Sequence, residues 1–119
     1  MRMLVVDDEP MMGATLRVTL RDHFDIELSP SGEHARARLE GGELFDVILT
    51  DLMMPGLSGM QLHAWLLERS SAQAAHMIFM TGGAYTNEAN EFLRRIPNPH
   101  VQKPFELDEL LDAIASLES

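Results

Sequence analysis

The stretch DVILTDLMMPGLSG, residues Asp46–Gly59, decides the fold. It contains a short apolar run, Val47–Thr50, that ends at an acid, Asp51, and is followed by a loop through Pro55–Gly56. A continuous aliphatic run bounded by turn residues is typical of a strand buried on both faces, as in a parallel sheet that helices cover on each side. Because ligands bind at the carboxyl ends of such strands, we expect Asp51 to lie at the functional edge of the sheet.

Length and composition indicate one globular domain over residues 1–119, because this length suffices for a single hydrophobic core. The formal net charge of −10 argues against nucleic acid or an anionic membrane as a direct partner, since both require a basic face. The lack of cysteine excludes disulfides, thiolate metal sites and thiol catalysis. No apolar stretch approaches the roughly 20 residues of a membrane span, and no signal peptide is recognisable, so we expect a cytoplasmic protein.

Two further apolar runs and two short segments predict strands, so that the expected strands are residues 3–6, 26–28, 47–50, 77–80 and 100–102. Five helices are expected to follow them, with inward-facing residues Met12, Leu16 and Leu20; Ala35 and Leu39; Leu62 and Leu66; Ala89, Leu93 and Ile96; and Leu107, Leu110, Leu111, Ile114 and Leu117. The third helix should begin with a capping box of Ser58 and Gln61 and end near Ser70–Ser71. This alternation predicts a doubly wound α/β sandwich with right-handed crossovers.

Polar side chains end four of the five expected strands. They are Asp7 and Asp8 after the first strand, Asp51 after the third, Thr81 after the fourth and Lys103 after the fifth. These positions converge if the strands are parallel neighbours. Clustered carboxylates repel one another unless a cation joins them, and Mg²⁺ takes one or two carboxylates together with phosphate oxygens. The set suits phosphoryl transfer, in which a carboxylate can form an aspartyl phosphate.

Four motifs follow one another with fitting separations: VVDDE (Val5–Glu9), DVILTDLMMPGLSG (Asp46–Gly59), MTGG (Met80–Gly83) and QKPF (Gln102–Phe105). Each motif is weak alone, but the four together are specific. On these motifs the chain resembles, over nearly its whole length, the receiver domain of bacterial two-component response regulators. The resemblance implies a (βα)5 flavodoxin-like fold with a parallel five-stranded sheet of order 2-1-3-4-5.

The resemblance also implies roles for individual residues. Asp51 would be the phosphoacceptor, and Thr81 and Lys103 would bind the phosphoryl oxygens. The implied Mg²⁺ ligands are the carboxylates of Asp8 and Asp51, that of Asp7 directly or through water, and the backbone carbonyl oxygen of Met53. The family further implies a cis Lys103–Pro104 bond, which the small cis penalty of proline permits.

Two positions depart from the family pattern. The residue after the switch threonine is usually alanine, whereas here Gly82 and Gly83 follow, which leaves space beside the expected site. Three residues before the lysine the family often has Tyr or Phe, whereas this chain has His100. His100 could make a similar rotamer change, and its protonation could add pH sensitivity because free histidine titrates near 6.5.

The family implies a phosphorylation-operated signalling module and not an enzyme with an external substrate, since it catalyses only its own phosphorylation and dephosphorylation. It would take a phosphoryl group from a histidine kinase or a histidine phosphotransfer protein. The surface formed by the fourth expected helix, the fifth strand and the fifth expected helix would then change and signal to a downstream protein. The resemblance leaves open whether phosphorylation also produces a dimer. The chain could stand alone or be a receiver cut from a larger protein. The stretch from the fourth helix through Glu106 resembles receivers at the C-terminus of hybrid sensor kinases.

Other interpretations compete with this one. A Mg²⁺-dependent phosphohydrolase resembling haloacid dehalogenases would need an Asp-x-Asp element and usually a cap domain, but here the acids are adjacent. A constitutive docking module could keep the fold without being phosphorylated. Locally, Asp8 could simply cap the first helix. The remaining histidines show no metal-ligand spacing and are expected at the surface or its rim; they are His23, His34, His63 and His76.

Overall fold

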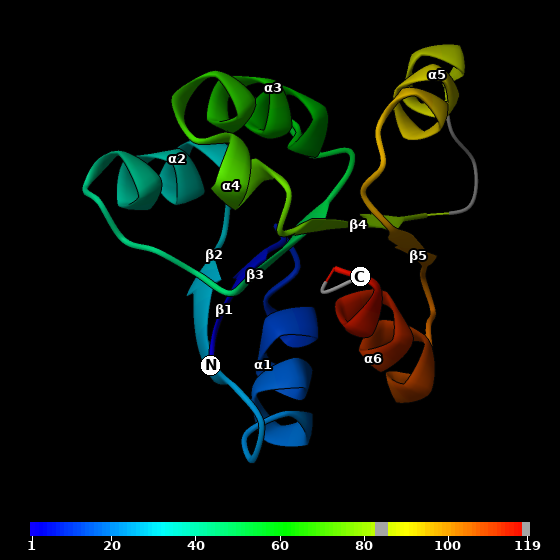
Figure 1. Cartoon of the computed structure of the whole chain (residues 1–119). Coiled ribbons are helices and arrows are strands. Elements are labelled where there is room, and N and C mark those ends of the chain that lie inside the picture. The colour runs from blue at the N-terminus through cyan, green and yellow to red at the C-terminus, as the bar shows by residue number, and fades with distance from the viewer. Residues whose placement is uncertain (83–85, 118–119) are drawn as a thin grey trace.

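A five-stranded parallel sheet forms the centre of the computed structural model, which describes residues 1–82 and 86–117 (Figure 1). The strands are β1 (Arg2–Val6), β2 (Asp25–Ser29), β3 (Val47–Asp51), β4 (Met77–Thr81) and β5 (His100–Gln102). They lie in the order β2-β1-β3-β4-β5, and each neighbouring pair is parallel. The predicted strands and their order are therefore confirmed, with bounds that agree within one residue at each end.

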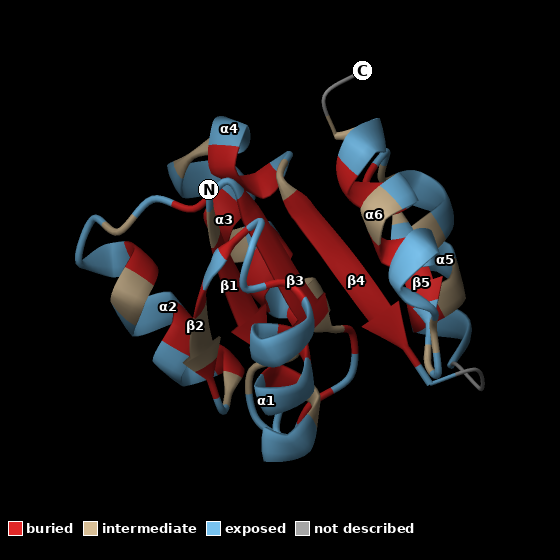
Figure 2. Cartoon of the chain, turned by 90° about the horizontal axis from the view of Figure 1, so that it is seen from below, coloured by how far each residue is buried: buried red, intermediate tan, exposed pale blue. Residues whose placement is uncertain are grey.

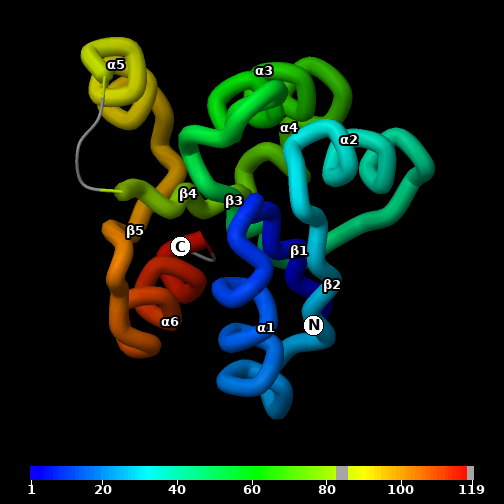
Figure 3. The backbone as a smooth tube through the Cα atoms, turned by 180° about the vertical axis from the view of Figure 1, so that it is seen from behind, coloured from blue at the N-terminus to red at the C-terminus, as the bar shows by residue number. Residues whose placement is uncertain are grey.

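Helices cover both faces of the sheet. They are α1 (Pro10–Thr19), α2 (Gly32–Glu40), α3 (Gly59–Arg69), α4 (Ser71–Ala74), α5 (Asn87–Arg95) and α6 (Leu107–Ser116). Helices α1 and α6 lie on one face, and α2, α3, α4 and α5 lie on the other, as the opposed views of Figures 1 and 3 both show. Among the described helices, none has both the length and the apolar character that a membrane span requires.

The alternation of side chains along each strand divides the hydrophobic core in two. On β1, Leu4 and Val6 face the core beneath α2, α3 and α5, whereas Met3 and Val5 face the core beneath α1 and α6. Figure 2 shows that β1, β3 and β4 are buried over nearly their whole length while the helices expose their outer faces. Such continuous burial explains why the central strands read as uninterrupted apolar runs.

The capping box predicted at the start of α3 is present. The Ser58 hydroxyl accepts a hydrogen bond from the Gln61 backbone N–H (3.2 Å), and the Gln61 side-chain oxygen accepts one from the Ser58 N–H (2.9 Å). Directly after the cap, a side chain at Gly59 would overlap the carbonyl oxygen of Asp51. Glycine at this position therefore lets α3 begin against the end of β3 and fixes the loop that carries Asp51.

The short helix α4 is the main difference from the prediction of five helices. Helix α3 ends near Ser70, as predicted, but the Ser70 hydroxyl also accepts a hydrogen bond from the Gln73 backbone N–H and so starts α4. The buried Gln73 side chain bonds both backbone groups of Phe45, at 3.0 and 2.8 Å. Helix α4 therefore fastens the loop that leads into β3, a contact with no local sequence signal.

Candidate metal centre at the carboxyl edge of the sheet

The ends of β1, β3 and β5 bring Asp7, Asp51 and Lys103 together. The Lys103 Nζ donates hydrogen bonds to Asp7 Oδ2 at 2.9 Å and to Asp51 Oδ2 at 3.2 Å. These residues come from opposite ends of the chain and meet because their strands are parallel and end at the same edge. The convergence expected from the sequence is therefore present.

Three carboxylates lie beside this lysine. One oxygen from each of Asp7, Asp8 and Asp51 lies within 4.8 Å of the others. Asp7 is buried, Asp51 is half-buried and Asp8 is exposed, so the cluster opens to solvent at Asp8. Hard carboxylate oxygens at this spacing, with solvent on one side, suit Mg²⁺, which keeps several waters when it binds to proteins.

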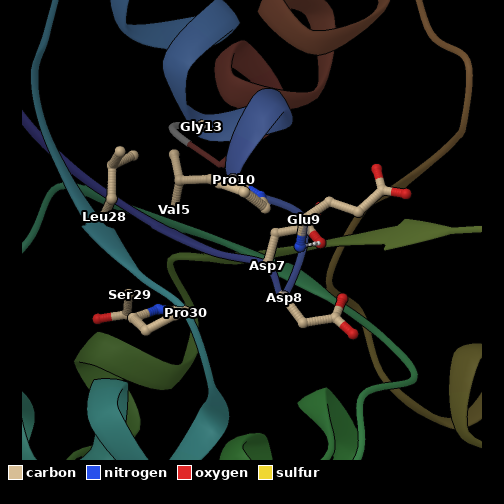
Figure 4. Close-up of a pocket in the computed structure, with 9 residues that line it drawn as sticks. All are labelled: Val5, Asp7, Asp8, Glu9, Pro10, Gly13, Leu28, Ser29 and Pro30. Carbon is tan, nitrogen blue, oxygen red and sulfur yellow. Dashed lines mark hydrogen bonds between the residues drawn. The ribbon is translucent and has the colours of Figure 1, made fainter.

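Asp7 is held by the turn between β1 and α1. Its Oδ1 accepts a hydrogen bond from the Glu9 backbone N–H at 2.9 Å, drawn as a dashed line in Figure 4, and its Oδ2 accepts from Lys103. The N-cap of α1 is Glu9, with Pro10 next and no side-chain cap bond, so the capping role considered for Asp8 is wrong. Figure 4 shows Asp7, Asp8 and Glu9 projecting from this turn beside a cavity of about 290 Å³.

Burial and charge shift the pKa of Asp51 in opposite directions, and they do the same to the pKa of Lys103. Burial raises the pKa of Asp51, and the charge and hydrogen bond of Lys103 offset this only in part. Burial alone would lower the pKa of Lys103, but the hydrogen bond that Lys103 donates to Asp7 and the charge of Asp51 outweigh it, so the pKa of Lys103 is raised. Lys103 therefore stays charged at neutral pH, and a cation near Asp51 would favour the carboxylate form.

Thr81 lies at the end of β4, next to the strand that leads to Lys103. Its side chain is buried, and its hydroxyl donates to the Val101 carbonyl oxygen at 3.4 Å. The Thr81 carbonyl oxygen accepts from the Lys103 backbone N–H at 2.7 Å, and the Lys103–Pro104 bond is cis, as the resemblance implied. A Cβ at Gly82 would meet no atom of the described residues within 4 Å, in agreement with the space expected there. Gly83 lies outside the described residues.

The two remaining predicted site residues lie in different surroundings. The Met53 backbone N–H donates to Asp51 Oδ1 at 3.4 Å, which places the Met53 backbone beside the acid cluster. His100 is exposed at the start of β5 and lines a separate cavity of about 460 Å³ with Asn90, Leu93 and Arg94. His100 therefore lies on the α5 side of the molecule, where a rotamer change would act on α5.

Comparison with known proteins identifies the family. Residues 3–115 match the model of the response regulator receiver domain. The chain belongs to this family. Among curated relatives, the transcriptional regulatory protein TcrA of Mycobacterium tuberculosis is 32% identical over 117 residues, which cover 98% of this chain and 45% of that protein. The sensor protein GacS of Pseudomonas syringae pv. syringae is 27% identical over 95% of this chain and 13% of its own length. The chain thus spans less than half of these two relatives.

Solved structures agree with this assignment. A receiver domain protein from Clostridium thermocellum is 25% identical and superposes with a TM-score of 0.83, over 98% of this chain and 92% of that chain. TrrA of Thermotoga maritima, solved in complex with Mg²⁺-BeF, is 28% identical with a TM-score of 0.81, over 98% and 97% of the two chains. Receiver domains are signalling modules of two-component systems, and this favours the signalling interpretation over a phosphohydrolase.

Glu33 is a supporting residue of the receiver site that the sequence did not reveal. Its Oε2 accepts a hydrogen bond from the Leu57 backbone N–H at 3.1 Å, in the loop between β3 and α3. A side chain at Gly56 would overlap this carboxylate, and one at Gly32 would overlap the Leu57 carbonyl oxygen. The start of α2 therefore holds the loop that contains Met53. No local pattern could have shown this contact, because 24 residues separate its partners.

The expectation that His63 lies at the surface or its rim is wrong. Its side chain is 5% exposed and packs between Phe79 of β4 and Phe92 of α5. The histidine follows Leu62 of the predicted core stripe, and α5 closes over the position beside that stripe. Helical spacing predicts burial of the apolar stripe alone, so it gave no reason to expect that a polar residue beside the stripe is buried.

Proposed function

We propose that this receiver accepts a phosphoryl group on Asp51 and that residues 1–119 act as one unit in a two-component phosphorelay. The single observation that carries the proposal is the pair of hydrogen bonds from Lys103 to Asp7 and Asp51, beside a third carboxylate, Asp8. A phosphoryl acceptor needs a carboxylate, a cation for the transferred charge and ligands for a metal ion, and all of these lie at one edge of the sheet.

The carboxylates of Asp7, Asp8 and Asp51, with the Met53 carbonyl oxygen, would hold Mg²⁺, which supplies positive charge to the phosphoryl oxygens. The Asp51 carboxylate oxygen attacks the phosphorus of a phosphohistidine. The new O–P bond forms as the P–N bond breaks, and the imidazole leaves with that electron pair. Lys103 neutralises charge on the transferred group, and Asp7 keeps the Lys103 ammonium in place.

The proposed signal arises when Asp51 carries the phosphoryl group. The Thr81 hydroxyl then exchanges the carbonyl oxygen of Val101, 3.4 Å away, for a phosphoryl oxygen, which is a stronger acceptor. This movement changes the surface of α5, β5 and α6, where His100 would take the position of the usual aromatic switch. The device is a two-state element that a local charge biases, and the output is a downstream protein or a second copy of the chain.

A groove between α1 and the start of α6 supports docking of the phosphodonor protein, a histidine kinase or a histidine phosphotransfer protein. The groove is about 370 Å³, and its lining includes Met11, Met12, Leu16, Pro104, Phe105 and Leu107. Met11 is 73% exposed, and the groove adjoins Lys103 through Pro104. A helix of the donor protein would place its apolar face in this groove and its phosphohistidine at Asp51. We propose that this contact takes place in the cytoplasm.

Phosphate incorporation from acetyl phosphate with Mg²⁺ tests the proposal. The wild-type receiver should gain acid-stable, base-labile phosphate, and Asp51→Asn should gain none. Asp22→Asn is the matched control, because Asp22 is exposed in the turn after α1, and it should label like wild type. Labelling that survives in Asp51→Asn would reject the assignment of the phosphoacceptor.

A further inference from the structure

Three aromatic rings join α5 to the body of the molecule. His63 of α3 meets Phe79 of β4 with ring centroids 5.8 Å apart, and Phe92 of α5 at 5.4 Å. Phe79 and Phe92 are 5.2 Å apart, and all three pairs are edge-to-face. Among the described residues of α5, only Ala89 and Phe92 are buried, so Phe92 is the largest side chain that this helix buries, and Leu93 packs half-buried against the same core. The position of α5 therefore depends in part on what Phe92 packs against.

The buried Asn98 side chain fastens the segment after α5 beside this cluster. It donates through Nδ2 to the carbonyl oxygens of Ala74 (2.8 Å) and Met77 (2.9 Å), so its remaining polar atom is the acceptor oxygen. The Asn98 side chain also interacts with His63, and this interaction raises the pKa of His63 in opposition to burial.

The charged groups that face His63 come from α5. His63 lines a groove of about 430 Å³ between α3 and α5, whose charged lining residues are Glu88, Glu91 and Arg95. The other lining residues from α3 are uncharged, and the neighbours from β4 and the segment after α5, Phe79 and Asn98, are uncharged as well. A proton on His63 would add a buried positive charge next to Arg95.

Burial lowers the pKa of His63, and the charge of Arg95 lowers it further, against the opposing effect of the Asn98 hydrogen bond. The ring released from the cluster would titrate near the ordinary value of 6.5. The released state therefore binds the proton more tightly than the packed state. The packed position of α5 is fully stabilised above that ordinary value and loses stability as the pH falls below it.

We propose that His63 is a positioning residue that keeps α5 packed on the sheet only while its imidazole is neutral, so that acid releases the helix that phosphorylation is proposed to move. Only the link between this movement of α5 and signalling rests on the proposed function. Phe79 and Thr81 are two residues apart on β4 and face the same side of the sheet, so the ring cluster adjoins the switch threonine. Protonation of His63 and phosphorylation of Asp51 would then both displace α5.

Amide hydrogen exchange of the unphosphorylated full chain tests the proposal. In wild type, the protection of α5 amides, corrected for intrinsic exchange, should fall between pH 7.5 and 5.5 by up to about tenfold, because at most one proton is taken up on release. His63→Phe keeps an aromatic ring without a titratable group and should make α5 protection independent of pH. His23→Gln, which changes an exposed histidine in the turn after α1, should leave the acid response intact.

A second pair of variants keeps the test decisive if His63→Phe folds poorly. Arg95→Gln removes the cation that faces His63, so the His63 titration followed by NMR should move to higher pH and the acid response should shrink. Arg21→Gln is the matched control and should change neither, because Arg21 is exposed in the turn after α1 and does not line the His63 groove. Wild-type protection that is equal at the two pH values, or a His63 midpoint unchanged in Arg95→Gln, would overturn the proposal.

The result also separates this inference from the proposed function. Asp51→Asn cannot accept a phosphoryl group on Asp51, but its α5 should respond to acid as in wild type, since His63 acts before any phosphorylation. An acid response without phosphate labelling of wild type would reject the proposed function alone. Labelling of wild type without an acid response would reject the role of His63 alone.

Discussion

The two halves of the sheet are held by different kinds of contact. Around β1 and β3, the loops of the acid cluster rest on close backbone approach at Gly59 and on hydrogen bonds between charged groups and backbone, such as Glu9 N–H to Asp7. At β4 and β5, the largest side chain that α5 buries, Phe92, packs on a cluster of rings, and Ala89 and Leu93 pack against the same core. Figures 1 and 3 both show α5 at this end of the sheet, away from α1 and α2.

This difference matches what each half would have to do. Phosphoryl transfer requires carboxylates and a cation that are already in place, because rearranging them during the reaction would add to the barrier. A switch instead requires an element whose displacement costs little free energy. The β1–β3 half therefore has the properties of a preorganised site, and α5 has those of the element that moves. Each prediction below changes a contact in one of these two regions and uses the other region as its control.

The largest effect is expected from truncating the ring cluster. Phe79→Ala should lower the free energy of unfolding by about 3–5 kcal/mol, because Phe79 is fully buried on the central strand β4. Phe92→Ala removes a phenylalanine side chain from α5. It should lower the global free energy of unfolding by less than Phe79→Ala does, because α5 can open locally while the sheet stays folded. Urea denaturation measures the first effect and hydrogen exchange the second. Equal global losses with α5 still protected would show that α5 is as firmly built as the sheet.

Lys103→Ala should have the next largest effect, at the acid cluster that Lys103 reaches from the end of β5. Without the lysine, the buried Asp7 loses its cation, and the free energy of unfolding in Mg²⁺-free buffer should fall by about 2–3 kcal/mol. Mg²⁺ should recover much of this loss because it supplies positive charge at the same place. Thermal unfolding with and without Mg²⁺ measures the recovery, and exchange in α5 should stay unchanged. A loss that Mg²⁺ cannot recover would argue against a metal site there.

A smaller effect of opposite sign is expected for Asp51→Asn without Mg²⁺. Burial raises the pKa of Asp51 above its ordinary value of 3.8, so the folded state holds the proton more tightly than the unfolded chain. The resulting stabilisation is present below that ordinary value and is lost as the pH rises through the raised pKa. Asp51→Asn should therefore be more stable than wild type at pH 7, with a smaller difference near pH 4. Urea titrations at both pH values measure it, with Asp22→Asn as control.

The smallest effect is expected at Glu33, which holds the loop after β3. Glu33→Ala removes the acceptor for the Leu57 N–H and should cost about 1 kcal/mol and slow phosphorylation by acetyl phosphate. Glu33→Gln keeps an acceptor oxygen and should restore most of the rate. A rate that is the same in all three proteins would show that the loop keeps its geometry without this contact.

The sequence predicted the parts of this comparison that depend on local patterns. Apolar runs and turn residues gave the five strands, and the acids and the lysine at their ends gave the site. The side chains that set the difference between the halves come from distant positions: Gln73 on Phe45, Glu33 on Leu57, and His63 between Phe79 and Phe92. A polar residue on a helix gives no local sign of the partner that will bury it, so His63 and the short helix α4 were missed.

The most direct test of the account is hydrogen exchange of the wild-type receiver with Mg²⁺ alone and with Mg²⁺ and beryllofluoride. Beryllofluoride would stand in for the phosphoryl group that we propose Asp51 accepts. The account predicts that protection changes in α5 and β5 while α1, α2 and β3 exchange as before, and that Asp51→Asn shows no change at all. Changes spread evenly over both halves, or an unchanged α5 in the wild-type protein, would contradict the division between a fixed site and a movable helix.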